Sequence, residues 1–196
     1  MIKPTLIFAT NNQHKVEEIR SIIGDEIMVI SLKEAGIDID IPEPYFTLEA
    51  NASEKSRTIH KLTKQNCFSE DTGLEVEALN GEPGVQSARY AGEEKNFQAN
   101  IDKLLEKLRG QENPTAKFRT VISLIWNDKE FLFEGVSEGK IIHEQRGERG
   151  FGYDPVFVPD QSENTFAEMT LDEKNKYSHR RKAMDKLISF LKAHIS

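Results

Sequence analysis

The sequence is poor in cysteine: Cys67 is the only one among 196 residues, so no disulfide can form within the chain. Chains without disulfides are typical of reducing compartments, and we expect a cytoplasmic protein. An uninterrupted apolar run of about 20 residues, which a membrane-spanning helix needs, occurs nowhere. The short apolar run near the N-terminus ends at the polar residues 11–15, too early for a signal peptide. We therefore expect no membrane association.

Basic residues are also in deficit. The 26 Lys and Arg residues face 33 Asp and Glu residues, which gives a net charge of −7 and argues against a nucleic-acid partner. A small anionic ligand in a local basic pocket is compatible with this balance. Zinc-ligand spacings, the Gly-x-Ser-x-Gly elbow and the Walker phosphate loop are absent too. The length and a hydrophobic fraction of 37% indicate one folded domain over residues 1–196.

The chain opens with a strand, a turn and a helix. Residues 5–9 form a continuous apolar run, as in a buried strand, and a helical apolar face follows at Val16, Ile19, Ile22 and Ile23. The turn over residues 10–15 presents backbone N–H groups at the positive end of the helix dipole. Lys15 adds a formal charge there, so the turn is a candidate phosphate site. An ordinary Asn-rich helix cap with a surface lysine is the alternative.

Two adjacent carboxylates, Glu70 and Asp71, follow the apolar pair Cys67-Phe68 and precede Thr72-Gly73. We expect a turn at the mouth of a strand, where neighbouring like charges repel and bury poorly. A divalent cation would offset this repulsion, and Mg²⁺ takes carboxylate oxygens while keeping room for substrate phosphates. A solvated turn with two surface acids is the alternative.

Glu43 lies between Pro42 and Pro44, in a rigid turn that precedes a helix predicted over residues 47–64. Lys55 lies two turns into that helix. Without further information, Glu43 is explained as a loop acid and Lys55 as a solvated helix lysine.

Further elements are predicted along the chain. A second strand covers residues 27–30, and a strongly amphipathic helix covers 97–108 and ends at Gly110. Two strands over 118–126 and 131–136 are joined by a hairpin signal at Asn127.

A glycine-rich segment covers residues 146–155. Phe151 and Tyr153 flank Gly152, and Asp154 follows. Aromatic faces and one carboxylate suit a purine, because stacking holds the ring and hydrogen bonds read its edge. The glycine spacing does not match a dinucleotide fingerprint. A glycine-rich hairpin whose aromatic side chains cover the core is the alternative.

The C-terminal part contains two helix starts. Residues 170–173 form a capping box that opens a short helix carrying Lys174. Ser178 is a suitable N-cap for the last helix, which places His179 and Arg180 in its first turn. Cations there oppose the helix dipole, and such local conflicts often mark functional sites. A weakly unfavourable surface cluster is the alternative.

In their joint order these fragments resemble the inosine triphosphate pyrophosphatase family, which removes aberrant purine nucleoside triphosphates. The match extends over nearly the whole chain. The matching blocks are Phe8-Ala-Thr-Asn-Asn-x-x-Lys15, Glu70-Asp-Thr-Gly-Leu74, Gly81-x-Pro-Gly-Val-x-Ser-Ala-Arg-Tyr-Ala-Gly92, Gly150-Phe-Gly-Tyr-Asp-Pro155 and Ser178-His-Arg180.

The resemblance implies an elongated α/β fold with a two-lobed mixed sheet, flanking helices and the active site in the cleft between the lobes. It also implies a homodimer and a Mg²⁺ requirement. The metal would be held by Glu43 and Asp71, with Asp71 and Glu70 as catalytic acids. The substrate-binding residues that the resemblance implies are Thr10, Asn11, Asn12, Lys15, Lys55, Thr72, Phe151, Gly152, Tyr153, Asp154, Lys174, His179 and Arg180.

The chain departs from the family pattern in two places. Many bacterial members carry Asp-Asp-Ser-Gly where this chain has Glu70-Asp-Thr-Gly73, and these substitutions keep the chemistry. Many members also have Glu directly before the Asn that corresponds to Asn51, whereas Ala50 stands there in this chain. We assign no role to Glu49.

The hypothesis is hydrolysis of a nucleoside triphosphate to the monophosphate and pyrophosphate. Asp71 would orient or deprotonate the attacking water, Glu70 would assist the metal shell, and Lys15, Lys55 and Lys174 would stabilise the polyphosphate. Arg180 and a backbone N–H would donate to a 6-oxo purine edge. Two alternatives stay open at this point: a related pyrophosphatase with a modified-pyrimidine preference, and a nucleotide-binding module without turnover.

Overall fold

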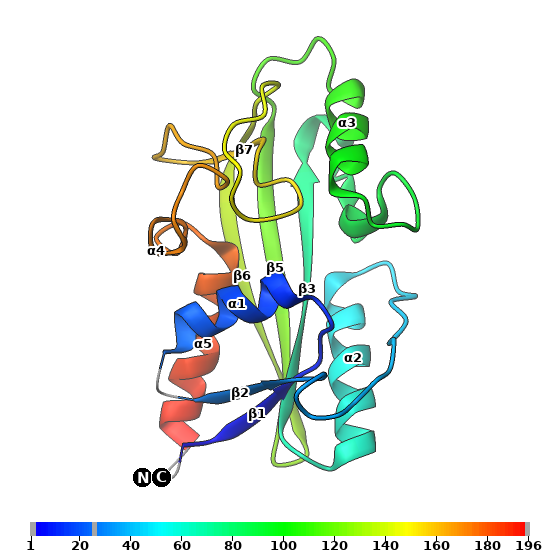
Figure 1. Ribbon diagram of the computed structural model, residues 1–196, viewed down its shortest axis with the longest axis vertical. Coiled ribbons are helices and arrows are strands. Elements are labelled where there is room, and N and C mark those ends of the chain that lie inside the picture. Colours follow the sequence, from blue (N-terminus) through cyan, green and yellow to red (C-terminus); the bar gives the residue numbers. More distant parts are fainter. Residues whose placement is uncertain (1–2, 25–26, 195–196) are drawn as a thin grey trace. The chain divides into compact units, whose positions relative to one another are not determined.

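The computed structural model describes residues 3–24 and 27–194 (Figure 1). Its described residues form two compact units, each assembled from separate chain segments. The first unit comprises Met1–Asp71, Thr120–Gly135 and Arg180–Ser196, and the second comprises Thr72–Arg119 and Val136–His179. Three long strands contribute residues to both units: β3 (Cys67–Val76), β5 (Thr115–Trp126) and β6 (Lys129–Ile141).

The strands form one mixed sheet in the order β2-β1-β3-β5-β6-β7, with β4 (Pro83–Gly84) paired to β3. β1 (Thr5–Phe8) is parallel to both β2 (Met28–Ser31) and β3. β4 is antiparallel to β3, and β7 (Phe157–Pro159) is antiparallel to β6. The sheet and its helices confirm the α/β fold with a mixed sheet.

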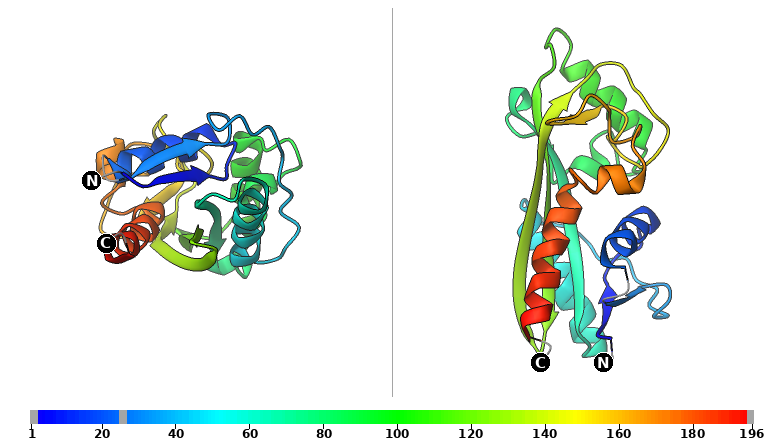
Figure 2. Two further views of the ribbon diagram at one scale, coloured as in Figure 1. Left: turned by 90° about the horizontal axis from the view of Figure 1, so that it is seen from below. Right: turned by 90° about the vertical axis from the view of Figure 1, so that its left-hand side faces the viewer.

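Three helices belong mainly to the first unit: α1 (Gln13–Ile23), α2 (Leu48–Thr63) and α5 (His179–His194). Thr47 caps α2, since its side chain accepts from the Ala50 N–H. α5 runs beside the long strands (Figure 2), and its Met184 and Leu187 pack into one core cluster with Leu124 of β5. The helices predicted from apolar periodicity are therefore confirmed.

The second unit contains α3 (Phe97–Lys107), α4 (Leu171–Lys174) and two short 3-10 turns, Glu77–Leu79 and Ser87–Arg89. The predicted capping box at Thr170 is present, because its side chain and that of Glu173 each bond the other's backbone N–H. The core of this unit includes Leu74, Ile101, Phe118, Phe157 and Phe166.

The predicted hairpin joins β5 to β6. Asn127 and Asp128 have φ values of +50° and +62°, which is typical of the two-residue turns that match strand twist. The prediction of a hairpin at this position is confirmed.

The predicted turn at Glu70 and Asp71 is wrong. β3 continues without a break from Cys67 to Val76, so both acids lie in the middle of a strand. At Gly73 a Cβ atom would lie 2.6 Å from the Gly84 carbonyl oxygen, so the close approach of β4 requires glycine.

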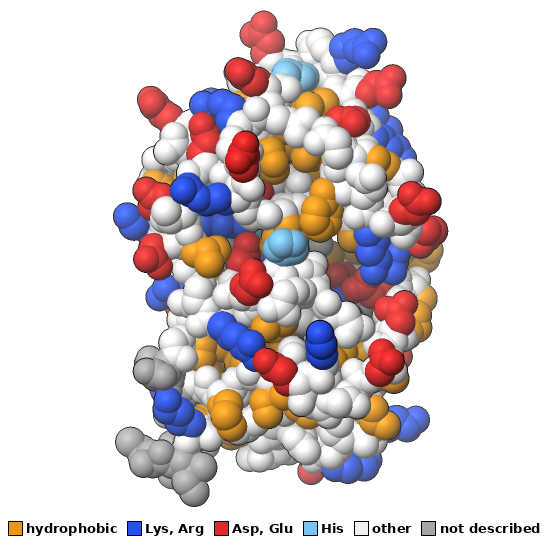
Figure 3. All heavy atoms as spheres, viewed as in Figure 1, with side chains coloured by type: hydrophobic (Ala, Val, Ile, Leu, Met, Phe, Trp, Pro, Cys, Tyr) orange, Lys and Arg blue, Asp and Glu red, His pale blue; other side chains and the backbone are white. Residues whose placement is uncertain are grey.

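No helix within residues 3–24 and 27–194 is long and apolar enough to cross a membrane. On the face seen in Figure 3, acidic and basic side chains are interspersed.

Candidate functional site

The turn between β1 and α1 is held by its own side chains. Asn12 is the N-cap of α1 and accepts from the Lys15 N–H at 3.3 Å, while the Thr10 hydroxyl accepts from the Asn12 N–H at 3.1 Å. Asn11 donates from its amide to the carbonyl of Ile39 at 2.9 Å, which ties the turn to the loop that carries Glu43. The sequence therefore builds a strand-to-helix turn of the kind that binds phosphate.

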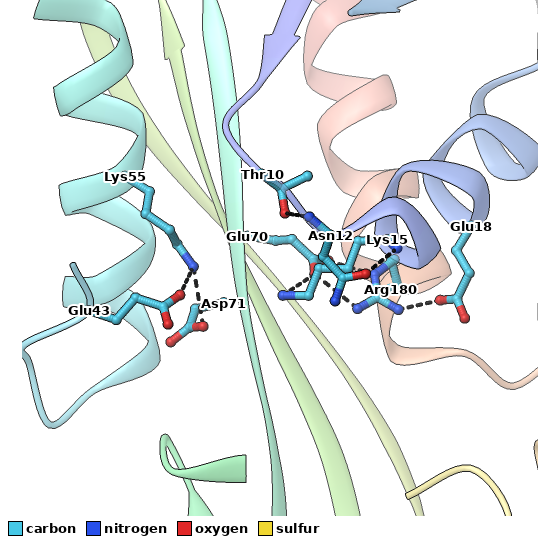
Figure 4. A network of polar contacts seen from close by, with 9 residues as sticks. All are labelled: Thr10, Asn12, Lys15, Glu18, Glu43, Lys55, Glu70, Asp71 and Arg180. Atoms are coloured by element: carbon cyan, nitrogen blue, oxygen red, sulfur yellow. Dashed lines mark hydrogen bonds and ion pairs between the residues drawn. The ribbon is translucent and has the colours of Figure 1, made fainter. Parts of the chain in front are cut away.

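Glu70 is fully buried and surrounded by cations (Figure 4). Its two carboxylate oxygens accept from Arg180 at 2.6 and 2.9 Å, and Lys15 Nζ lies 2.9 Å from Oε1. Arg180, itself only 1% exposed, also pairs with Glu18 of α1. Burial disfavours the charged form of Glu70, but Arg180 and Lys15 outweigh it and hold the pKa of Glu70 well below its usual range.

Asp71 lies on the other side of β3, because successive side chains of a strand point to opposite faces. Figure 4 shows Asp71 directed towards α2 and Glu70 towards α1 and α5. The two acids therefore contact different cations directly, Glu70 with Arg180 and Lys15 and Asp71 with Lys55. Protein cations compensate Glu70, and its place in a metal shell stays a prediction.

Glu43 and Asp71, which are distant in sequence, meet at one ammonium group. Lys55 Nζ lies 2.5 Å from Glu43 Oε1 and 3.3 Å from Asp71 Oδ1. Burial raises the pKa of Asp71, and the charges of Lys55 and Lys15 oppose that shift without cancelling it. Burial disfavours charged Lys55, but Asp71 and Glu43 outweigh it and raise the Lys55 pKa. Lys55 is thus a buried cation, not a solvated helix lysine.

This carboxylate pair fits a hard divalent cation. It already holds a positive charge between two oxygens, and carboxylate oxygens are the ligands that Mg²⁺ prefers. Within residues 3–24 and 27–194, no group of three or more His, Cys, Asp or Glu side chains is arranged to hold a metal. A site with two protein carboxylates would be completed by water and substrate phosphates, as Mg²⁺ sites commonly are.

The predicted base-binding residues gather in the second unit. Asp154 Oδ2 accepts from the Phe151 N–H at 3.0 Å and from Lys174 Nζ at 2.6 Å. Lys174 Nζ also lies 5.6 Å from the centre of the Phe151 ring, within cation–π range. Gly152 adopts a φ of +61° between these residues. Lys174 therefore contacts the loop that is predicted to bind the base, and its role at the polyphosphate stays a prediction.

Tyr153 differs from its predicted role. Its side chain is 3% exposed, lies in the core of the second unit, and donates its hydroxyl to the Ser87 carbonyl at 2.8 Å. Burial raises its pKa. Tyr153 thus anchors the loop in the core of the second unit. The prediction that its ring stacks on a purine is wrong, because the ring is buried among core residues.

The remaining predicted site residues are placed as follows. His179 is buried, and its ring stacks on Phe118 with centroids 4.7 Å apart. His179 and Arg180 therefore do not form a solvated surface cluster. Thr72 is half-buried in β3. The role of Arg180 at the purine edge stays a prediction, since its guanidinium is directed at Glu70 and Glu18.

The sequence analysis assigned no functional role to three residues that contact predicted site residues or the loop that carries Glu43. Glu18 pairs with Arg180, Asn51 bonds the loop before α2, and Phe97 lies 6.0 Å from the Phe151 ring. Glu18 and Asn51 occupy buried positions on their helices. A polar residue on an apolar helix face is a readable signal, because burying it requires a partner.

The family model described as the Ham1 family matches residues 6–190. A dITP/XTP pyrophosphatase of Porphyromonas gingivalis is 51% identical, over 95% of this chain and 96% of that protein. One of Flavobacterium psychrophilum is 48% identical, over 95% and 98%. The structure of the Staphylococcus aureus Ham1 protein has a TM-score of 0.86 at 41% identity, over 97% and 99%. These matches confirm the resemblance found in the sequence, and the chain belongs to the Ham1 family.

Proposed function

We propose that this chain hydrolyses aberrant purine nucleoside triphosphates, namely ITP, dITP, XTP and dXTP, to the monophosphate and pyrophosphate. This removal keeps the aberrant bases out of nucleic acid. The names of the relatives support the reaction class. The observation that carries it is the meeting of Glu43 and Asp71 at one buried cation.

Glu43 and Asp71 would hold Mg²⁺. When bound, the ion supplies charge neutralisation at the phosphate oxygens. The fit rests on the two carboxylates and on the cation that they already hold between them.

Residues of the chain activate the attacking water and stabilise the charge of the polyphosphate. Asp71 accepts a proton from water as the oxygen of that water attacks the α-phosphorus. The bond from the α-phosphorus to the bridging oxygen breaks, and pyrophosphate leaves. Lys15 and Lys55 stabilise the negative charge of the polyphosphate, together with the N–H groups at the start of α1.

The base is bound by the loop around Gly152. Phe151 offers an aromatic face, and Asp154 offers a carboxylate that is oriented by the Phe151 N–H and by Lys174. Inosine and xanthosine carry a 6-oxo acceptor where adenine carries an amino donor. A site that donates a hydrogen bond there can reject adenine strongly. In this proposal, His179 and Arg180 also bind the nucleotide, around its phosphates and its 6-oxo purine edge.

A substrate panel tests the proposal. Pyrophosphate release with Mg²⁺ is measured for ITP, XTP, GTP, ATP and a modified pyrimidine triphosphate. We expect ITP and XTP to be preferred, and equal rates on all purines would refute the selectivity. Preference for the pyrimidine would assign a different substrate, and ITP binding without pyrophosphate would indicate a non-catalytic module. Asp71→Asn should lower kcat by about 10²–10⁴-fold, the range for losing a general base, with unchanged circular dichroism.

The proposal includes a homodimer that acts in the cytoplasm on free nucleotides. The single cysteine supports a reducing compartment, and the net charge of −7 argues against nucleic acid as a partner. Light scattering after size exclusion would measure the mass, and a monomer would refute the dimer without affecting the reaction.

A further inference from the structure

The loop that carries Glu43 is held in place by Asn51, a buried residue of α2. Asn51 of α2 is 2% exposed, and its side chain makes two hydrogen bonds with the backbone of Tyr45. Its Oδ1 accepts from the Tyr45 N–H at 2.9 Å, and its Nδ2 donates to the Tyr45 carbonyl at 3.1 Å. An amide that satisfies both backbone groups of one residue fixes the position and orientation of that peptide segment.

Fixing Tyr45 also fixes Glu43, because only Pro44 lies between them. The ring of Pro44 restricts its own φ, and a residue before proline is held to extended conformations. The segment from Glu43 to Tyr45 therefore has little freedom once the Tyr45 peptide groups are bound. At the other end of the loop, Asn11 holds the carbonyl of Ile39.

Asn51 and Lys55 share one face of α2, since they are four residues apart. Lys55 binds the Glu43 carboxylate, and Asn51 binds the backbone two residues further along. One helix face thus receives both the side chain and the main chain of the acid-bearing loop. Neither contact needs substrate or metal.

We propose that Asn51 is a positioning residue for Glu43, so that the carboxylate pair with Asp71 is formed before a divalent cation binds. This inference rests on the proposed function, in which that pair holds the metal. Residues that orient metal ligands typically change metal affinity by about 10–100-fold when they are replaced.

Asn51→Leu removes both hydrogen bonds and keeps the number and branching of the side-chain heavy atoms. Binding of Mn²⁺, a substitute for Mg²⁺, is measured from the free-ion signal in electron paramagnetic resonance, without nucleotide and independently of turnover. We expect the Mn²⁺ affinity of the variant to fall by about 10–100-fold. In turnover assays, the Mg²⁺ concentration that gives the half-maximal rate should rise as the Mn²⁺ affinity falls. This rise should exceed any rise in the KM for ITP measured at saturating Mg²⁺.

Asn100 provides a matched control. It is also 2% exposed, lies four residues after a helix N-cap as Asn51 does, and bonds the backbone of a preceding loop. It accepts from the Ala91 N–H at 2.7 Å and donates to the Ala88 carbonyl at 3.0 Å. Asn100→Leu should destabilise the fold comparably but leave Mn²⁺ affinity unchanged. Equal losses of affinity in both variants would overturn the inference.

A double-mutant cycle gives a second criterion. If Asn51 acts through Glu43, then Asn51→Leu should have little effect on Mn²⁺ affinity in a Glu43→Gln background, because the ligand is already lost. Additive losses, or wild-type Mn²⁺ affinity in Asn51→Leu, would refute the positioning role. Should the Leu variant not fold, Asn51→Ser is measured in the same way. Full activity of Asp71→Asn would instead refute the proposed function, so the two failures are distinguishable.

Discussion

The guanidinium of Arg180 lies between the carboxylates of Glu70 and Glu18, and all three side chains are buried. Buried charges are tolerated when they are paired and hydrogen-bonded. Removal of one partner leaves the charge of the other uncompensated. Arg180 therefore allows two acids to lie inside the first unit. One of them, Glu70, in turn pairs with Lys15 at the start of α1.

Replacing Arg180 should be costly for stability. We expect Arg180→Met to lower the free energy of unfolding by about 3–5 kcal/mol, because the buried carboxylates of Glu18 and Glu70 both lose the guanidinium between them. Urea denaturation measures this change. The neighbouring Arg181 forms an exposed pair with Asp185, so Arg181→Met should cost less than about 1 kcal/mol. Similar losses in the two variants would contradict the assigned role of Arg180.

Cys67 should be chemically inert in the folded protein. It is fully buried, its Sγ donates to the Ser56 carbonyl at 3.2 Å, and burial raises its pKa to about 12. The thiolate is the reactive form, so labelling with a disulfide reagent at pH 8 should proceed only as fast as unfolding. Rapid labelling of the native protein would show that the thiol is accessible.

The same shift makes stability depend on pH. The usual thiol pKa is 9.0, so between pH 9.0 and about 12 the unfolded chain releases the Cys67 proton and the folded chain retains it. The contribution of this group to stability is therefore lost as pH rises through that window. Cys67→Ala should remove this component from the alkaline pH dependence of unfolding in urea.

Individual residues were predictable from sequence when their partners were local. Thr170 and Glu173 have the spacing of a capping box, and Asn12 is only three residues from Lys15, whose N–H it accepts from. The partner of Glu70 is not predictable from local sequence, because Arg180 lies 110 residues away. A pair of adjacent acids gives no indication in sequence that its members face opposite sides of a strand.

Among the elements, β3 combines the most functions. It carries Cys67 in the core, the two acids in its centre and Gly73 against β4. The helices could be predicted because apolar residues recur at helical spacing and capping residues mark their ends. The continuity of β3 could not, because two neighbouring charges inside a strand contradict every local preference for burial.

A methyl group at position 73 should disturb this strand. In Gly73→Ala the new Cβ would lie 2.6 Å from the Gly84 carbonyl oxygen and 2.9 Å from the Gly84 carbonyl carbon, so β3 and β4 must separate. We expect a loss of about 1–3 kcal/mol in the free energy of unfolding, the range for overpacking. Thermal denaturation monitored by circular dichroism measures it. An unchanged melting temperature would mean that β4 moves aside freely.

At the scale of the whole chain, the Ham1 match extends over segments of both units. The matching blocks, from Phe8 to Arg180, come from both units, so their joint order constrains the fold as well as the chemistry. No single block gave this specificity. The polar network of Figure 4 shows why, since each side chain has its role only in relation to partners from other segments.

Metal binding should be visible as a change in global stability. A ligand that binds only the folded state adds about 2.7 kcal/mol at a concentration of 100 times its Kd. We therefore expect Mg²⁺ to raise Tm in the wild type, to a degree that increases with its concentration. In Asp71→Asn and Glu43→Gln the shift should be largely lost. An equal shift in all three proteins would place the cation elsewhere.

The first unit is completed by α5, whose Arg180 lies in the third segment of that unit, 110 residues after Glu70. During translation, Glu18 and Glu70 therefore emerge from the ribosome long before the guanidinium that neutralises them. Before α5 is synthesised, closing the core around these acids would bury carboxylates without the guanidinium of Arg180, which is strongly unfavourable. We expect a nascent chain stalled before α5 to remain open and sensitive to protease, and a chain that includes α5 to become resistant.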